Sequence, residues 1–207
     1  MTQWEIAVIG LCILSGPGVA GLITNGSFEV GDEPGAWRSL YAPDSVTIRN
    51  WTVSAGSVDY IGSYWQAADG NRSLDLTGTG APGTIVQTFV TPWPGVPHRI
   101  SFALAGNPDV QPRTTGVRVW INDPNVLYRD FTFVVNGQTR SNMGWTYVSW
   151  WFTPSSAVNT LGFTSLDNYP GLLWGPALDD VRVDAVPEPG TLLLVGLALI
   201  VASSRRR

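Results

Sequence analysis

The chain contains no lysine, and its twelve basic residues are all arginine, three of which are the last three residues. Charged residues make up 14% of the 207 positions, against roughly 25% in an average soluble domain. The formal net charge is -4, and no basic cluster lies inside the chain. Because nucleic-acid binding needs such a cluster to neutralise phosphates, we expect no nucleic-acid partner.

Cysteine and histidine each occur once, as Cys12 and His98. Cys12 lies in an apolar run near the start, and removal of that run leaves no thiol for a disulfide, a zinc knuckle or a cysteine nucleophile. His98 lies directly before a predicted strand, and the chain has no Gly-x-Ser-x-Gly elbow beside which it would act as a base. A structural or solvent-facing histidine is therefore favoured, and we expect no enzyme.

The first twenty residues have the order of parts of a secretory signal peptide. Residues 6–15 are apolar or small, a run too short to cross a bilayer but suited to a signal-peptide core. Gly18 and Ala20 are small enough for a signal peptidase site, so cleavage is expected after Ala20. The segment before the run has no Lys or Arg, and the alternative is a buried N-terminal strand.

The C-terminal segment, residues 186–207, combines three elements. Pro187, Glu188 and Pro189 precede an apolar stretch over 191–202, and Arg205, Arg206 and Arg207 end the chain. This order resembles the PEP-CTERM sorting signal of Gram-negative bacteria. The resemblance implies a short apolar helix that anchors the chain transiently in the inner membrane, with its arginines on the cytoplasmic side. It also implies cleavage by an exosortase; the alternative is an ordinary helical tail.

Between the two ends, residues 21–185 read as one β-rich domain. Short segments with period-2 patterning alternate with Gly, Pro, Asn and Asp, and no convincing helix or βαβ pattern occurs. About ten strands with turns between them indicate a sandwich or barrel. The predicted strands are 47–53, 57–61, 73–76, 84–90, 99–104, 116–121, 130–135, 146–152, 160–164 and 178–184.

Motifs at both ends of this domain resemble known extracellular folds. It opens with Asn25-Gly26-Ser27-Phe28-Glu29 and closes with Asp179-Asp180-Val181-Arg182-Val183, a pairing similar to galactose-binding-like jelly rolls, which include carbohydrate-binding modules. The interior resembles the bacterial choice-of-anchor C domain, whose members are joined to different surface anchors. The segments that carry this second resemblance are 51–53, 56–61, 64–65, 69–70, 73–76, 105–108 and 142–145.

The resemblance to galactose-binding-like jelly rolls also implies a structural calcium ion (Ca2+) between the first and last strands. Glu29 would end the first strand, and Asp179 would share the inward face of the last strand with Val181 and Val183. An unpaired buried carboxylate is costly, and calcium accepts carboxylate and carbonyl oxygens. We therefore predict a metal site at Glu29 and Asp179, with Asn25 as a further ligand. The alternative is carboxylates capped by backbone N–H groups or arginine.

A sugar site requires exposed aromatic rings with polar side chains beside them. The segment from Tyr60 to Arg72 is rich in both, and loop aromatics are better functional candidates than strand aromatics. We expect Trp37 and Trp93 in loops, and core positions for Trp51, Trp120, Trp145, Trp150 and Trp151. Tyr64 and Trp65 are predicted with equal weight as ligand contacts or as a packed turn. The predicted ligand-binding residues are Tyr60, Tyr64, Trp65, Asp69 and Arg72.

Together these features predict an exported bacterial protein of the cell surface or the extracellular, exopolysaccharide-rich matrix. An exosortase would sort it, and its all-β jelly-roll β-sandwich would bind an extracellular polysaccharide. The alternatives are a structural or adhesive matrix protein without a sugar site, and an exported hydrolase. Some pair of carboxylates at glycosidase spacing is inevitable among fourteen acidic residues of the domain, so their number favours no enzyme.

Overall fold

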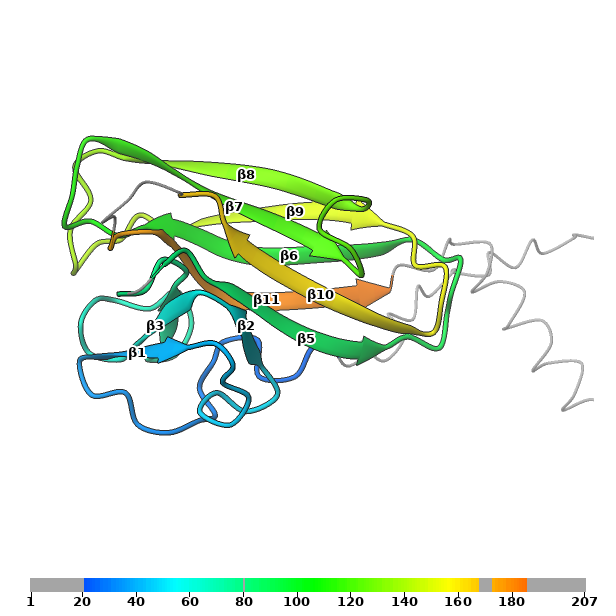
Figure 1. Ribbon diagram of the computed structural model, residues 1–207. Helices are drawn as coiled ribbons and strands as arrows, with labels where there is room; N and C mark the ends of the chain where they lie inside the picture. Colours follow the sequence, from blue (N-terminus) through cyan, green and yellow to red (C-terminus); the bar gives the residue numbers. More distant parts are fainter. Residues whose placement is uncertain (1–20, 80, 168–172, 186–207) are drawn as a thin grey trace, which may run out of the picture.

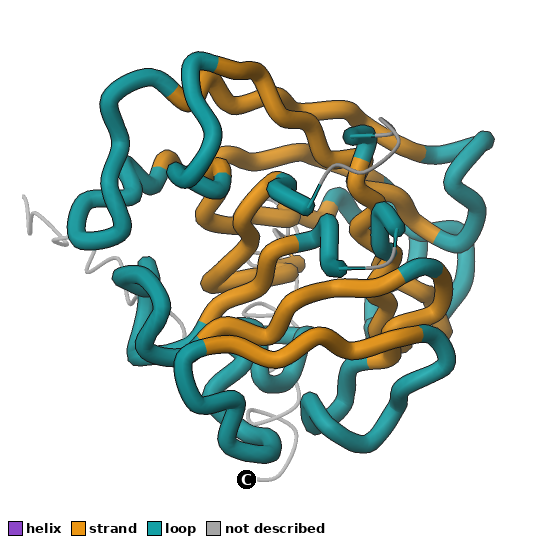
Figure 2. The backbone as a smooth tube through the Cα atoms, turned by 60° about the vertical axis from the view of Figure 1, so that its left-hand side comes forward, coloured by secondary structure: helices purple, strands orange, loops and turns teal. Residues whose placement is uncertain are grey.

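The computed structural model describes residues 21–79, 81–167 and 173–185. Within them the chain forms eleven strands and no helix (Figures 1 and 2). The strands are β1 (Trp37–Tyr41), β2 (Thr52–Ala55), β3 (Ser57–Ile61), β4 (Ser73–Asp75), β5 (Thr84–Val90), β6 (His98–Gly106), β7 (Arg113–Ile121), β8 (Tyr128–Val135), β9 (Thr146–Phe152), β10 (Val158–Ser165) and β11 (Pro176–Ala185).

The strands make two antiparallel sheets that pack face to face. The six-stranded sheet has the order β1-β3-β4-β11-β6-β9, and the five-stranded sheet has the order β2-β5-β10-β7-β8. In Figure 1, β10 crosses in front of β6 and β11, so the two sheets lie as two layers. This arrangement confirms the predicted all-β sandwich.

The core lies between the sheets and is built by the alternation of apolar side chains along each strand. Phe102 on β6 packs edge-on against Phe163 on β10, with ring centroids 5.2 Å apart. Trp51 packs against Phe163 and against Phe28, which is fully buried. One continuous apolar core therefore joins the N-terminal segment to both sheets.

The start of the domain differs from the prediction. Residues 22–29 are not a strand, although Leu22 donates to the Val183 carbonyl and Val181 donates to the Gly26 carbonyl, both at 2.9 Å. Gly26 lies so close to β11 that an added Cβ would come within 1.9 Å of the Val181 carbonyl oxygen. The segment therefore runs beside β11 without forming a ladder, and Glu29 ends no strand.

The last strand carries an irregularity that the period-2 reading missed. Its pairing with β6 shifts register between Asp179 and Arg182, and Asp180 has a φ of 45°. Because a β-bulge inserts one extra residue, Leu178 and Val181 both face the core. Asp179 therefore lies on the opposite face from Val181 and Val183, which corrects the predicted inward face.

The tryptophans divide differently from the expectation as well. Trp51, Trp120 and Trp150 are buried, as predicted. Trp145 is half-buried, and Trp151 is 52% exposed, because it lies on the outer face of the sheet-edge strand β9. The prediction of a core position is therefore wrong for Trp151. Trp37, expected in a loop, lies in β1.

The expected signal peptide, residues 1–20, and the expected sorting segment, residues 186–207, lie outside the described residues. Among the residues that the structure does describe, none forms a helix long and apolar enough to cross a membrane.

Candidate functional site

Two loops fold over the outer face of the six-stranded sheet. Residues 62–72 join β3 to β4, and residues 136–145 join β8 to β9. Gln66 donates to the Arg140 carbonyl at 2.8 Å, and the Trp145 indole donates to the Gln66 carbonyl at 2.9 Å. Beneath them lies a second apolar cluster, formed by Ile61, Trp65, Ala105, Met143 and Ala177. The loops are therefore packed on the sheet.

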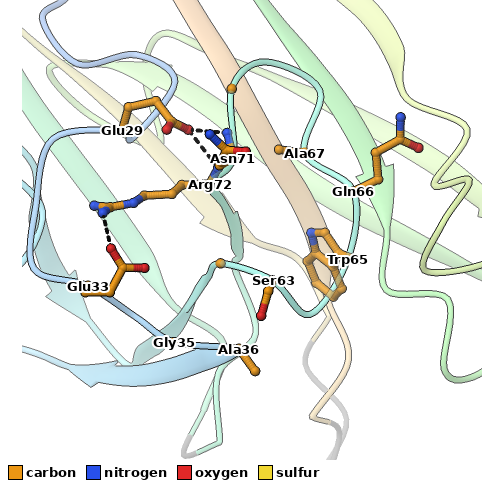
Figure 3. Close-up of a pocket in the computed structure, with 12 residues that line it drawn as sticks. Glu29, Glu33, Gly35, Ala36, Ser63, Trp65, Gln66, Ala67, Asn71 and Arg72 are labelled. Atoms are coloured by element: carbon orange, nitrogen blue, oxygen red, sulfur yellow. Dashed lines mark hydrogen bonds and ion pairs between the residues drawn. The ribbon is translucent and has the colours of Figure 1, made fainter.

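Two carboxylates fix the 62–72 loop from outside it. Glu29 accepts hydrogen bonds from the backbone N–H groups of Asn71 and Arg72, at 2.8 and 2.7 Å (Figure 3). Asp179 accepts from the backbone N–H groups of Ala68 and Asp69, at 2.7 and 3.0 Å. Burial raises the pKa of Asp179 to about 7. Both predicted metal ligands thus hold the same loop.

This arrangement bears directly on the predicted calcium site. Backbone N–H groups cap the two carboxylates, which is the alternative left open by the sequence. The Asn25 side-chain amide bonds to nearby backbone groups. It donates to the Val30 and Arg49 carbonyls and accepts from the Val30 N–H. Across residues 21–79, 81–167 and 173–185, no three His, Cys, Asp or Glu side chains lie close enough together to hold a metal. Glu29, Asp179 and Asn25 therefore do not form a shell of free oxygens, and the calcium site stays a prediction.

A wide hollow of about 850 Å³ lies between the 62–72 loop and the segment that precedes β1 (Figure 3). Arg72 spans its side, donating to Glu33 at 2.7 Å and to the Tyr60 hydroxyl at 2.8 Å. Its lining is mostly polar, and its one aromatic side chain, Trp65, is buried. The wide hollow therefore offers no free ring face to a sugar.

A narrow hollow of about 130 Å³ lies on the outer face of the six-stranded sheet. Trp37 lines it with 45% of its surface exposed, and its indole meets the Tyr64 ring edge-on at 6.5 Å between centroids. Both polar and aromatic side chains line it. The lining residues are Trp37, Asp59, Ile61, Tyr64, Trp65, Asp75, Thr79, Asn107, Asp109, Leu173 and Trp174.

Two aspartates from neighbouring strands form part of this lining. Asp59 on β3 and Asp75 on β4 are direct partners in the antiparallel pairing, and both are buried. Burial raises the pKa of Asp59, and burial together with the nearby Asp59 charge raises the pKa of Asp75 to about 8. Since like charges directly opposite each other repel, the pairing with Asp59 favours the protonated form of Asp75.

The rim of the narrow hollow is a network that ties three loops together. Asp109 accepts a hydrogen bond from the Tyr64 hydroxyl and two from Arg140. The Arg140 guanidinium lies 4.0 Å from the centre of the Tyr64 ring. Burial alone would raise the pKa of Asp109, but the bonds from Arg140 and Tyr64 outweigh it and lower that pKa. Arg140 covers one face of Tyr64, so Trp37 is the freer ring.

The structure separates the five predicted ligand-binding residues. Tyr60 is fully buried and donates to the Phe28 carbonyl; it is a core residue, and the prediction that it contacts a ligand is wrong. Trp65 is 5% exposed and donates to Ser73, which is the packed-turn alternative. Tyr64 lines the narrow hollow and Arg72 the wide one. Asp69 is exposed, outside both linings.

Sequence reasoning named Trp37 as a loop aromatic but left it out of the predicted ligand-binding set, and it missed Asp59, Asp75 and Asn107. A usable signal existed in the alternation of β3 and β4, where Asp59 and Asp75 lie on the face opposite the core residues Tyr60 and Leu74. His98 is also fully buried. Its two ring nitrogens bond to the Thr91 hydroxyl and the Val96 carbonyl, each at 2.7 Å, which gives it a structural role.

The two antiparallel sheets, with loops packed on an outer face, define a jelly-roll β-sandwich of the architecture found in carbohydrate-binding modules. TmCBM61, solved in complex with beta-1,4-galactotriose, aligns with a TM-score of 0.52 and 14% identity, over 81% of this chain and 100% of that one. At that identity the likeness shows the fold alone. The chain belongs to the family described as "Protein of unknown function (DUF642)", whose model matches residues 21–184.

A second family model, the PEP-CTERM protein-sorting motif, matches residues 185–207 and confirms the sorting signal inferred from the tail. The chain is also 33% identical over 172 residues to Halomucin from Haloquadratum walsbyi. That alignment covers 81% of this chain but 2% of Halomucin, so the chain spans a small part of that relative. The finer resemblance to the choice-of-anchor C domain stays a prediction.

Proposed function

We propose that this protein is exported, sorted by an exosortase and displayed at the cell surface or in the extracellular matrix, where its β-sandwich binds a polysaccharide. The sorting motif supports the first part, because such a signal marks exported proteins. Anchoring by the short C-terminal apolar segment before cleavage belongs to the same proposal.

One observation carries the binding part: the half-exposed Trp37 lines the same hollow as aspartate and asparagine side chains. An indole face packs on the C–H groups of a sugar ring, while carboxylate and amide groups bond to its hydroxyls. The narrow hollow is smaller than the roughly 300–1,000 Å³ of drug-sized sites. It therefore fits one sugar ring or one substituent, with the rest of a glycan outside it.

Binding rather than hydrolysis agrees with the bonding of the acidic groups. Asp75 accepts from the backbone N–H groups of Thr77 and Gly175 and from the Asn107 amide, each at 2.9 Å. A carboxyl group held in this way is positioned and buried, whereas a general acid must reach the scissile oxygen. Asp75 instead supports the wall of the hollow beside Asp59, its partner in the pairing of β3 with β4.

A glycan array probed with the exported protein tests the proposal. Trp37→Ala should weaken binding to any retained glycan by about tenfold or more, since loss of a central aromatic anchor costs about 1.4 kcal/mol or more. Trp93→Ala is the matched control: Trp93 is 37% exposed and lines neither hollow. Equal weakening by both substitutions, or no effect of Trp37→Ala, would place any sugar site elsewhere.

The second candidate is a structural or adhesive matrix protein with no sugar site. The observation that favours it is the bonding of Asp75, Asn107 and Asp109 to protein partners, which leaves a ligand to compete for them. A complete absence of retained glycans, combined with adhesion of the exported protein to cells or matrix, would support this candidate and overturn the first.

A further inference from the structure

The two sheets end in four edge strands, β1, β9, β2 and β8. An edge strand offers unpaired backbone N–H and C=O groups to any other strand, and proteins protect such edges with charge, shortness or bulges. Three of the four edges have this protection. β1 carries Arg38, β2 has four residues and a register shift, and β8 carries Arg129 and Asp130.

The fourth edge, β9, has none of it. Its seven residues, Thr-Tyr-Val-Ser-Trp-Trp-Phe, include no charge, no proline and no glycine. Its pairing with β6 runs without a shift from His98–Phe152 to Leu104–Thr146, so no bulge turns it aside. Among the described residues, no strand pairs with its other side. β9 is thus a long, regular and uncharged edge.

The outer face of this edge is aromatic. Tyr147 is 60% exposed and Trp151 52% exposed, with the exposed Ser149 between them on the same face. Tyr147 is held in place by its hydroxyl, which donates to Asp180 at 3.0 Å. Tyr147 and Trp151 each lie two residues from Ser149. The outer face therefore presents a large ring on either side of a small residue in both chain directions.

We propose that β9 pairs antiparallel with β9 of a second copy of this chain, about a two-fold axis at Ser149. In that register Tyr147 lies opposite the Trp151 of the other copy, and Trp151 opposite its Tyr147. Aromatic cross-strand pairs stabilise a sheet, and an isologous interface requires this self-complementarity. Neither strand brings a charge to the interface, so the pairing meets no like-charge repulsion. The dimer would join the two six-stranded sheets into one.

Light scattering of the exported protein tests this first. The wild type should have twice the mass of one chain, and Ser149→Lys should have the mass of one, because it places two like charges on the axis. Thr132→Lys is the matched control, since Thr132 is an exposed residue at the middle of the charged edge β8. It should leave the dimer intact.

A cross-link keeps the test independent of any folding defect. Directly opposed residues of antiparallel strands have Cα atoms about 4.5–5.5 Å apart, within the range that a disulfide spans. Ser149→Cys should therefore form a covalent dimer on mild oxidation, and Thr132→Cys should not. A wild type with single-chain mass at the highest soluble concentration would overturn the proposal, as would a Ser149→Cys variant that fails to cross-link or a Ser149→Lys variant that stays dimeric.

Discussion

The two most strongly shifted carboxyl groups make the stability of this domain depend on pH. Burial raises the pKa of Asp75 to about 8 and that of Asp179 to about 7, from an ordinary 3.8. Between pH 5 and 7 the raised pKa values favour the protonated form of both groups in the folded state, whereas both are mostly ionised in the unfolded chain. Folding is therefore favoured by protons in this window, and stability falls as the pH rises.

The size of the effect follows from these two shifts. One pKa unit corresponds to about 1.4 kcal/mol, so each group lowers the free energy of unfolding by up to about 1.4 kcal/mol per pH unit in this window. Over the two pH units from 5 to 7, both groups together account for about 5 kcal/mol. That is a large part of the roughly 5–15 kcal/mol that stabilises a typical domain.

Urea unfolding of the exported protein at several pH values measures this slope. Asp75→Asn should reduce it by about 1.4 kcal/mol per pH unit, because the amide does not titrate. The amide oxygen can still accept from Thr77 and Gly175, so the fold should survive even if absolute stability changes.

Asp44→Asn is the control with the opposite sign. Burial acts to raise the pKa of Asp44, but hydrogen bonds from Thr47 and Val46 lower it overall. Its contribution is therefore present above pH 3.8 and lost as the pH falls, and the substitution should alter only the acid limb. A wild-type stability that is flat or rises from pH 5 to 7 would refute the reasoning, as would an unchanged slope in Asp75→Asn.

Two further predictions concern the metal and the tail. For calcium, the prediction from the sequence is that millimolar calcium raises the melting temperature of the chelator-treated protein by several degrees, with the rise lost in Asp179→Ala and Glu29→Ala but kept in Asp44→Ala. Identical melting curves in chelator and in calcium would show that backbone N–H groups, those of residues 68–72 and of Asp180, satisfy the two carboxylates. For the tail, intact mass spectrometry of protein from an exosortase-competent host should show loss of everything after about Pro187. Replacing Arg205, Arg206 and Arg207 with Glu should impair sorting, since arginine sets the orientation; full-length protein retained in that host would contradict it.

The sequence predicted the fold class well because period-2 alternation is a local property. The prediction missed features that leave no local pattern in the sequence. β1 follows Pro34 and Gly35 and buries only Leu40, so its five residues show no alternation to detect. The bulge in β11 depends on the positive φ of Asp180, which no spacing of apolar residues reveals.

The candidate site was predicted in part. The loop containing Tyr64 was found because aromatic and polar residues are concentrated there. Asp59, Asp75 and Asn107 come from three separate segments. Only the pairing of β3 with β4, of β4 with β11 and of β11 with β6 brings them together. The burial of Tyr60 followed from packing under the segment that contains Phe28, a long-range contact.

Under the proposed function, the narrow hollow beside Trp37 binds a glycan. The most direct measurement is the ¹H–¹⁵N spectrum of the exported protein, titrated with the best oligosaccharide from the array and read at the tryptophan indole signals. Trp37→Phe and Trp93→Phe assign the two signals of interest. The Trp37 indole signal should shift as oligosaccharide is added and reach a plateau, while the Trp93 signal should not move. A saturating titration that leaves the Trp37 signal in place would contradict the proposed glycan binding.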